Sequence, residues 1–134
     1  MSCCSDVMKP IEAASCCTPQ DSAVQAAQAM KHSGCGCAPV VEDTENLKLV
    51  GVVTERDICH SVAAEDIKAS EVSVKDIMRP AASACCGADD SLDEAQRKLD
   101  EHISTSLPVI DAAGGCCGTV SLNQILKNSH TQTA

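Results

Sequence analysis

Residues 49–58 read Leu49-Val50-Gly51-Val52-Val53-Thr54-Glu55-Arg56-Asp57-Ile58. The first five positions are apolar or Gly, which is typical of a buried strand that another backbone approaches closely. Charged residues at helical spacing follow, so the stretch predicts a strand that turns directly into a helix. Thr54 can cap this helix, and Asp57 lies one turn on, near the same exposed amides. Such a corner can hold a diol and an anion, or Thr54 can be only a cap and Asp57 only a solvated carboxylate.

The chain contains an internal repeat that includes this corner. Five landmarks recur in order, 67 to 70 positions apart, which indicates a duplicated unit. The pairs are Met8-Lys9-Pro10 with Met78-Arg79-Pro80, Cys16-Cys17 with Cys85-Cys86, Asp21-Ser22 with Asp90-Ser91, Pro39-Val40-Val41 with Pro108-Val109-Ile110, and Gly51-Val52-Val53-Thr54 with Gly118-Thr119-Val120-Ser121.

Each copy predicts the order strand, helix, strand, strand, helix, and therefore an α+β fold. Ser22 with Gln25, and Ser91 with Glu94, match the capping box that begins a helix. The expected elements are strands near 14–17 and 84–86, helices starting near Asp21 and Asp90, hairpins of 38–41 with 49–54 and of 107–111 with 116–120, and final helices after Thr54 and Ser121. The apolar stripes predicted to face the core are Ala23, Ala26, Ala27 and Met30 in one helix and Leu92, Ala95, Leu99 and Ile103 in the other.

The repeat sets the predicted domain organisation. The first repeat covers residues 5–62 and the second covers residues 74–127. Between them, residues 63–73 are polar and acidic without a clear period, which indicates a linker. Residues 128–134 are predicted to be a frayed C-terminal tail.

Composition narrows the function classes. The chain has no Phe, Tyr or Trp and a net charge of −9, so bases cannot stack on aromatic rings and phosphate backbones are repelled. Nucleic-acid binding is therefore disfavoured. No apolar run approaches the ~20 residues of a membrane span, and the N-terminus does not resemble a signal peptide, so we expect a cytoplasmic protein without a membrane partner. An enzyme is disfavoured too, because no paired nucleophile and base stands out.

The eleven cysteines occur mostly as adjacent pairs. None shows the two-residue gap typical of zinc knuckles or iron–sulfur loops, so no metal site is predicted. In a reducing cytoplasm thiols behave as small apolar groups, and we interpret most of them as core filler. Cys35 and Cys37 leave open a thiol-based redox or metal-responsive function.

In combination, these motifs resemble the cystathionine-β-synthase (CBS) domain pair over about residues 5–127. The resemblance implies tandem CBS repeats packed with pseudo-twofold symmetry, as in the small stand-alone CBS proteins (Bateman modules). The stretches that carry it are Gly34-Cys35-Gly36-Cys37-Ala38-Pro39-Val40-Val41, Gly51-Val52-Val53-Thr54-Glu55-Arg56-Asp57-Ile58 and Asp76-Ile77-Met78-Arg79-Pro80.

The resemblance also implies a regulatory site for an adenine-containing ligand in the cleft between the repeats. It assigns both ribose hydroxyls to Asp57 and a ribose or phosphate contact to Thr54. A carboxylate suits this role because it accepts from two hydroxyls at once. The segments implied to complete the site are Ser104-Thr105-Ser106 across the pseudo-twofold and the backbone of Cys86-Gly87-Ala88 beside the base.

Charge limits which ligand is expected. Relatives often carry Arg or His where this chain has Ser104-Thr105-Ser106, and the nearby cations Arg56, Lys75 and Arg79 have directions that the sequence does not set. Arg56 could equally be an exposed helix residue paired with a neighbouring carboxylate. We therefore expect AMP, S-adenosylmethionine or adenosine rather than ATP. In the second copy Gln124 replaces the expected Asp, so its pocket is expected to be empty or weaker.

The implied site is compatible with two alternative functions. A sensor would signal to an unidentified partner protein through a ligand-driven change of shape. A ligand-free dimerisation scaffold is the alternative, because helices flanking each repeat commonly pack against a second pair in this family and give a homodimer. Val24, Met30, Ile58 and Val62 could supply that surface or belong to the core.

Overall fold

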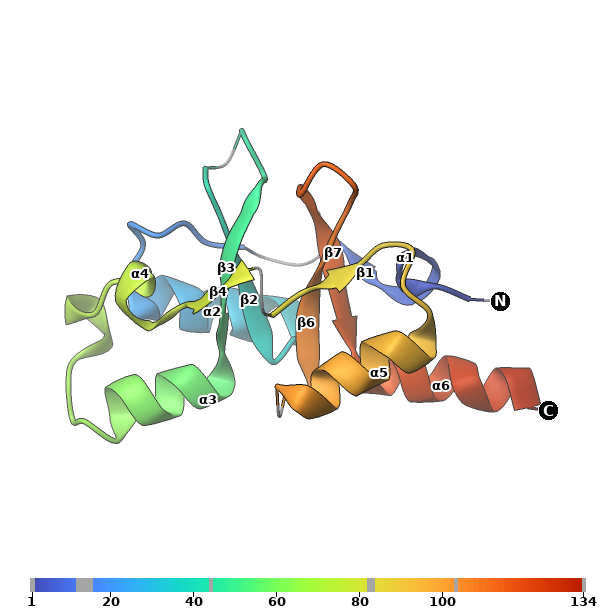
Figure 1. The fold of residues 1–134 in the computed structure, drawn as a ribbon. Coiled ribbons are helices and arrows are strands. Elements are labelled where there is room, and N and C mark those ends of the chain that lie inside the picture. The colour runs from blue at the N-terminus through green and yellow to red at the C-terminus, as the bar shows by residue number, and fades with distance from the viewer. Residues whose placement is uncertain (1, 12–15, 44, 82–83, 103, 134) are drawn as a thin grey trace.

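The computed structural model describes residues 2–11, 16–43, 45–81, 84–102 and 104–133, and its elements follow the predicted order (Figure 1). Most of the strand predicted at 14–17 lies outside these residues, and so does Ile103. The first half comprises α1 (Cys4–Val7), β1 (Lys9–Pro10), α2 (Ala23–Ser33), β2 (Cys37–Val41), β3 (Leu49–Thr54), α3 (Glu55–Ile58) and a π-helical continuation, η1 (Cys59–Ala63). The second half comprises a 3₁₀ turn, η2 (Ala69–Glu71), then α4 (Val74–Ile77), β4 (Arg79–Pro80), β5 (Cys86–Gly87), α5 (Leu92–Glu101), β6 (Ser106–Ile110), β7 (Cys116–Ser121) and α6 (Leu122–Thr133).

The two sheets exchange their outer strands. β4 pairs with β3 in a sheet of order β2-β3-β4, and β1 pairs with β7 in a sheet of order β1-β7-β6-β5. The segment that opens each repeat therefore completes the sheet of the other repeat, and Figure 1 shows α1 beside the second repeat and α4 beside the first. Gly51 permits this pairing, because a Cβ there would lie 2.7 Å from the carbonyl oxygen of Arg79. This confirms the close backbone approach predicted for residues 49–53.

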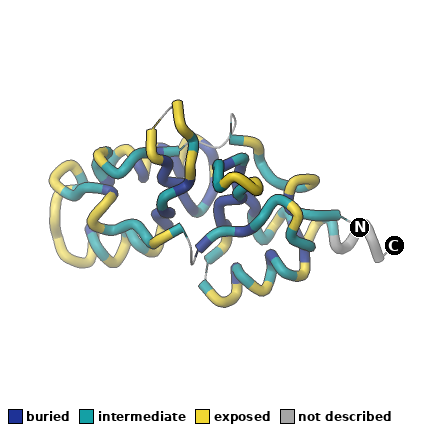
Figure 2. The backbone as a smooth tube through the Cα atoms, turned by 45° about the horizontal axis from the view of Figure 1, so that its top comes forward, coloured by how far each residue is buried: buried dark blue, intermediate teal, exposed yellow. Residues whose placement is uncertain are grey.

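Apolar side chains form one core cluster for each repeat and a third between the hairpins. Backbone hydrogen bonds join the hairpins near their tips: the N–H of Cys116 donates to the carbonyl of Leu47 at 2.8 Å, and that of Leu49 donates to Gly114 at 3.0 Å. Figure 2 shows that buried positions concentrate in the central strands, whereas hairpin tips and the connection between the repeats are exposed. The sheets therefore form a rigid base on which the strand-to-helix corners sit.

Helix α2 begins where predicted, but the apolar stripe that it buries in the core differs from the predicted one. The side-chain oxygen of Gln25 accepts from the N–H of Ser22 at 2.7 Å, which closes the predicted cap. Ala23, Ala26 and Met30 are buried. Ala27, however, is exposed, and Ala29 is buried in its place. That prediction was wrong because the spacing of four apolar residues alone allows two adjacent stripes, and packing against β2 selects one.

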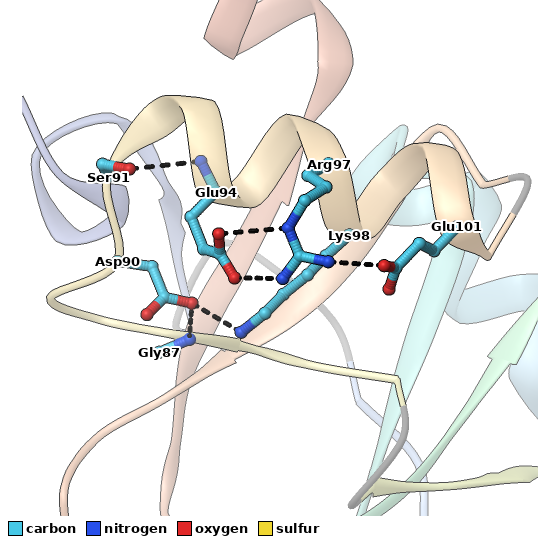
Figure 3. Close-up of polar contacts among 7 residues, drawn as sticks. All are labelled: Gly87, Asp90, Ser91, Glu94, Arg97, Lys98 and Glu101. Carbon is cyan, nitrogen blue, oxygen red and sulfur yellow. Dashed lines mark hydrogen bonds and ion pairs between the residues drawn. The ribbon is translucent and has the colours of Figure 1, made fainter.

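Helix α5 has only half of its predicted capping box. The Ser91 hydroxyl accepts from the N–H of Glu94 at 3.1 Å. The Glu94 carboxylate is paired with Arg97, which lies one turn further along the helix and also contacts Glu101 (Figure 3). A charged partner therefore replaces the backbone amide that the capping box predicts. At the other end of the chain, α6 continues to Thr133, through most of the segment predicted as a frayed tail.

All eleven cysteines are free thiols, and six of them are buried. Burial raises the pKa of the thiols of Cys17, Cys37 and Cys116 to about 12, so these groups remain protonated at neutral pH. For these three positions the interpretation as core filler is confirmed.

Candidate ligand-binding site

The corner between β3 and α3 is built by two reciprocal hydrogen bonds. The N–H of Asp57 donates to Thr54 Oγ1 at 3.2 Å, and the N–H of Thr54 donates to Asp57 Oδ2 at 2.9 Å. The predicted cap at Thr54 is therefore confirmed. Asp57 is not a freely solvated carboxylate, because only 14% of its side chain is exposed.

Arg79 occupies the other oxygen of this carboxylate. Its Nε lies 3.2 Å from Asp57 Oδ1, and its Nη1 donates to the carbonyl of His102 at 3.4 Å. The register of β4 against β3 sets this position, because Arg79 pairs with Val52, two residues before Thr54. Arg79 thus bridges the corner of the first repeat and the end of α5 in the second. Its side chain is 30% exposed.

A small cleft opens beside this corner. It is lined by Gly36, Thr54, Glu55, Arg56, Ser104 and Thr105, and its volume is about 130 Å³. Four of the predicted site residues therefore meet here, namely Thr54, Arg56, Ser104 and Thr105. Sites for drug-sized ligands typically measure ~300–1,000 Å³, so a nucleotide needs this cleft to widen. We call it the first cleft.

A second cleft lies at the equivalent corner, where β7 meets α6. Its volume is about 170 Å³ and its lining holds hydroxyls and one amide but no carboxylate or cation. The hydroxyl of Ser106 is buried and, among the described residues, has no hydrogen-bond partner. The lining residues are Gly34, Cys35, Gly36, Thr105, Ser106, Ser121, Leu122 and Asn123.

Gly36 and Thr105 line both clefts and are equivalent positions, 69 residues apart. Their carbonyls accept from the first amides of α3 and α6, with Glu55 N–H donating to Gly36 at 3.1 Å and Leu122 N–H donating to Thr105 at 2.8 Å. A Cβ on Gly36 would lie 2.6 Å from Thr105 Oγ1. The pair therefore forms the wall between the clefts. From the sequence, Gly36 was expected only as part of the segment 33–37 that faces the second pocket, and not as a residue shared by both clefts, although its offset from Thr105 was visible in the repeat.

The second corner repeats the first with neutral chemistry. Gln124 Oε1 accepts from the N–H of Ser121 at 2.8 Å, and the N–H of Gln124 donates to Ser121 Oγ at 3.3 Å. Lys9, the equivalent of Arg79, donates from Nζ to the carbonyl of Ser33 at 2.5 Å. That carbonyl is the counterpart of His102. Among the described residues no ion pair forms at this corner.

Two predicted site residues, Cys86 and Gly87, do not lie at the first cleft. β5 runs parallel to β6, with Cys86 opposite Val109 and Gly87 opposite Ile110, which places both near the far end of β6. Four residues of strand separate Ile110 from Ser106, or roughly 13 Å at ~3.3 Å per residue. Gly87 instead donates its N–H to Asp90, which is also paired with Lys98 (Figure 3). Ser106, the remaining predicted residue, lines the second cleft.

A third cavity, larger than either cleft, lies between α2 and α3 and shares Glu55 with the first cleft and Gly34 and Cys35 with the second. It has a volume of about 400 Å³ and is mainly apolar, with Lys31 and Glu55 as its charged members. Its other lining residues are Ala27, Met30, Gly34, Cys35 and Ile58. Within the described ranges, no group of three or more His, Cys, Asp or Glu side chains is arranged to hold a metal ion. No helix in the described part of the chain is both long and apolar enough to cross a bilayer.

Comparison with known proteins agrees with this duplicated architecture. The family model described as CBS domain matches residues 4–64 and 74–131. The chain belongs to the CBS-domain family. The inosine-5'-monophosphate dehydrogenase of Streptococcus pyogenes is 30% identical over 110 residues, which make up 82% of this chain but 21% of the dehydrogenase, so the chain spans about a fifth of that relative.

Solved structures of CBS pairs share the fold. The structure of CBSX2 in complex with AMP has a TM-score of 0.78 and 23% sequence identity, with both chains covered completely. Hypoxic Response Protein I with two coordinated zinc ions also has a TM-score of 0.78, with 22% identity, and 94% of this chain and 98% of that one are covered. The tandem CBS fold predicted from the sequence is therefore confirmed.

Proposed function

We propose that this CBS pair is a regulatory module that binds an adenine-containing ligand, with AMP favoured, in the first cleft. The observation that carries the proposal is the set of contacts made by the Asp57 carboxylate. Its carboxylate accepts from the N–H of Thr54, a residue that lines the first cleft, and is paired with Arg79, whose side chain is exposed enough to leave. A ribose diol can replace Arg79 on this carboxylate without disturbing the hydrogen bonds of the cap. The AMP complex of a protein with the same fold supports this choice of ligand.

The charges around the first cleft favour a monophosphate over a triphosphate. Arg56 lines the cleft, and Arg79 becomes available once Asp57 has taken the ribose. Glu55 offsets part of this positive charge, in a chain whose net charge is −9. Two cations can balance the negative charge of a monophosphate such as AMP. They cannot balance the larger negative charge of a triphosphate. S-adenosylmethionine and adenosine remain ligands to compare with AMP.

Displacement of Arg79 supplies a route from ligand to partner protein. Arg79 contacts Asp57 in the first repeat and the His102 carbonyl in the second, so its release removes a contact that holds the repeats in one relative position. The ligand then binds one arrangement of the repeats better than the other, which is the requirement for a population shift. A partner protein that recognises that arrangement reads the signal. In this role the chain acts in the cytoplasm as a sensor and not as an enzyme.

We further propose that the module is a homodimer, with a second copy covering the apolar cavity between α2 and α3. Met30 and Ile58 line this cavity, and Lys31 and Glu55 at its edge offer charges of both signs to the opposite copy. Of the residues predicted for the dimer surface, Val62 is buried within its own chain and Val24 is half-buried. A scaffold that dimerises without any ligand is the second candidate function, because both oxygens of Asp57 are already satisfied.

The absorption spectrum of the purified, reduced protein tests the ligand. Without Trp or Tyr the chain absorbs little above the peptide band, so a co-purified adenine produces a distinct band that is lost on denaturation and in Asp57→Ala. Calorimetric titration with AMP, S-adenosylmethionine, adenosine and ATP then ranks the ligands, and AMP is expected to bind most tightly. A blank spectrum and no heat with any of the four, together with a dimer in light scattering, contradicts the sensor and supports the scaffold.

A further inference from the structure

The N-terminal strap, residues 3–10, bonds through its backbone to the second repeat and not to the repeat that it precedes. The N–H groups of Cys4 and Ser5 donate to the carbonyls of Asp90 and Ala88, both at 3.0 Å. β1 then pairs with β7 at the edge of the second sheet. The strap therefore crosses the loop between β5 and α5 before it reaches the first repeat.

This crossing brings one member of the pair Cys3-Cys4 onto one member of the pair Cys85-Cys86. Cys4 and Cys86 are fully buried in the same apolar cluster, and the interaction between their thiols shifts the pKa of each. Their neighbours point elsewhere. The Cys3 thiol contacts Ser5 Oγ at 3.1 Å and Asp6 Oδ2 at 3.4 Å, and Cys85 packs in the cluster between the hairpins.

We propose that Cys4 and Cys86 form a reversible disulfide, with a peroxide as oxidant, that locks the N-terminal strap onto the second repeat. The proposal rests on two fully buried cysteines that share one apolar cluster, although they lie on segments 82 positions apart in the chain, and on the backbone hydrogen bonds that tie Cys4 and Ser5 to the loop after Cys86. Adjacent cysteines cannot pair with each other without strain, and the fold gives each of these two a partner on another segment.

The two thiols differ in pKa, and this difference determines which of them reacts first. The hydrogen bond from Cys86 lowers the pKa of Cys4, whereas the same bond, together with burial, raises the pKa of Cys86. Cys4 is therefore the more readily deprotonated of the two, and its thiolate is the group that attacks hydrogen peroxide. A sulfur–oxygen bond forms, the peroxide bond breaks, and the products are a sulfenic acid on Cys4 and hydroxide. Cys86 sulfur then attacks Cys4 sulfur and displaces its oxygen, and the two thiol protons leave in two molecules of water.

Local opening of the strap admits the oxidant. α1 spans only four residues, and such short helices open at low cost compared with a core strand. Once formed, the disulfide prevents this opening. Lys9 in the strap donates to the carbonyl of Ser33, next to Gly34 in the lining of the second cleft, so the lock also fixes one wall of that cleft.

Peptide mapping of the full chain tests the proposal. The reduced protein is treated with hydrogen peroxide, free thiols are alkylated, and the chain is cleaved after glutamate, which separates Cys3 and Cys4 from Cys16 and Cys17. We expect one linked species that joins residues 1–12 to the peptide containing Cys85 and Cys86. It should form in Cys3→Ala and Cys85→Ala, which are the matched controls, and be absent in Cys4→Ala and Cys86→Ala.

Thermal unfolding adds a second readout. The oxidised wild type should melt roughly 5–15 °C above the reduced protein, and dithiothreitol should reverse the shift. A link that persists in Cys4→Ala, or one that fragmentation assigns to Cys3 or Cys85, overturns the proposal, and so does the absence of any link. If Cys4→Ala or Cys86→Ala fails to fold, fragmentation of the linked wild-type peptides decides the assignment alone.

Discussion

The two strand-to-helix corners have the same backbone but different charges. At both, a hydroxyl and a side-chain oxygen exchange hydrogen bonds with the first turn of a helix. At the first corner the oxygen belongs to Asp57, and the other oxygen of the same carboxylate is paired with Arg79. At the second corner Gln124 supplies the oxygen, and Lys9 contacts only the carbonyl of Ser33 among the described polar contacts. Capping therefore needs only an oxygen at this position, whereas holding a displaceable cation needs a charge.

This difference explains why the two clefts are expected to have different functions. A capping role is satisfied equally by Asp and Gln, so the geometry of the corner does not require the carboxylate. The ion pair with Arg79 does require it, and that pair lies where the two repeats meet. We infer that the first corner is a binding and switching site, and that the second is a structural copy of it.

Removing the carboxylate at the first corner should have the largest effect. Asp57→Ala is expected to weaken AMP binding roughly 10- to 100-fold, because a hydrogen bond to a charged group contributes about 1.5–3 kcal/mol and each 1.4 kcal/mol is tenfold in affinity. Gln124→Ala should hardly change it. Calorimetric titration of both variants measures the difference. Equal losses would contradict the assignment of the site, and Asp57→Asn separates the lost charge from the lost cap.

Placing a carboxylate at the second corner tests whether the missing charge accounts for the difference between the two corners. Gln124→Asp is expected to create an Asp–Lys9 pair and a second adenine site, raising the binding stoichiometry from one to about two per chain. The effect should be smaller than that of Asp57→Ala, because the lining of the second cleft carries no cation. Stoichiometry from calorimetry checks it, with Lys9→Met added to Gln124→Asp as a control. An unchanged stoichiometry indicates that the wall of the cleft, and not Gln124, excludes the ligand.

Arg79 should control the preference between charged and neutral ligands. Arg79→Met is expected to bind adenosine several-fold more tightly, because Asp57 is then free, and to lose the preference for AMP over adenosine. Lys9→Met, its matched control, should change neither affinity. The effect on the free energy of unfolding should stay below about 1 kcal/mol, since the ion pair is partly exposed. Parallel titrations of AMP and adenosine measure the ratio, and an unchanged ratio would show that Arg79 does not meet the phosphate.

The smallest predicted effect concerns Asp90 and its equivalent, Asp21. Burial opposes ionisation of Asp90, but the bonds from Lys98 and the Gly87 N–H outweigh it and lower the pKa of this carboxyl. Its contribution is therefore complete above its usual pKa of 3.8 and is lost as the pH falls below that value. Lys98→Met should reduce stability by less than about 1 kcal/mol at neutral pH and weaken the acid dependence near pH 3–4.

Asp21 is the internal control for this effect. It accepts from the N–H of Thr18 at 2.9 Å, as Asp90 accepts from Gly87, but Ala29 stands at the position equivalent to Lys98. Denaturation curves at several pH values measure the effect of Lys98→Met, and at neutral pH Asp90→Asn should lose more stability than Asp21→Asn. Equal losses would indicate that the backbone bond, and not Lys98, accounts for the contribution of Asp90.

Most of the architecture follows from local sequence. The landmarks from Met8 to Ser121 predicted the duplication, alternating and apolar runs predicted the hairpins, and Ser22 and Ser91 predicted the starts of α2 and α5. These features depend on contacts within a few residues, so the chain encodes them directly. The capping role of Thr54 and Asp57 is of the same kind, because both groups lie within one helical turn.

Contacts between distant segments could not be predicted from the sequence and became visible only in the tertiary structure. The exchange of β1 and β4 between the sheets turned Arg79 toward Asp57 and placed Cys4 on Cys86, and the parallel pairing of β5 with β6 moved Cys86 and Gly87 away from the first cleft. Composition and periodicity contain no information on which sheet edge a two-residue strand joins. The repeated unit and its capped corners could therefore be predicted from the sequence alone. Which side chains meet across the repeats could not, because those contacts depend on the burial and register of whole strands.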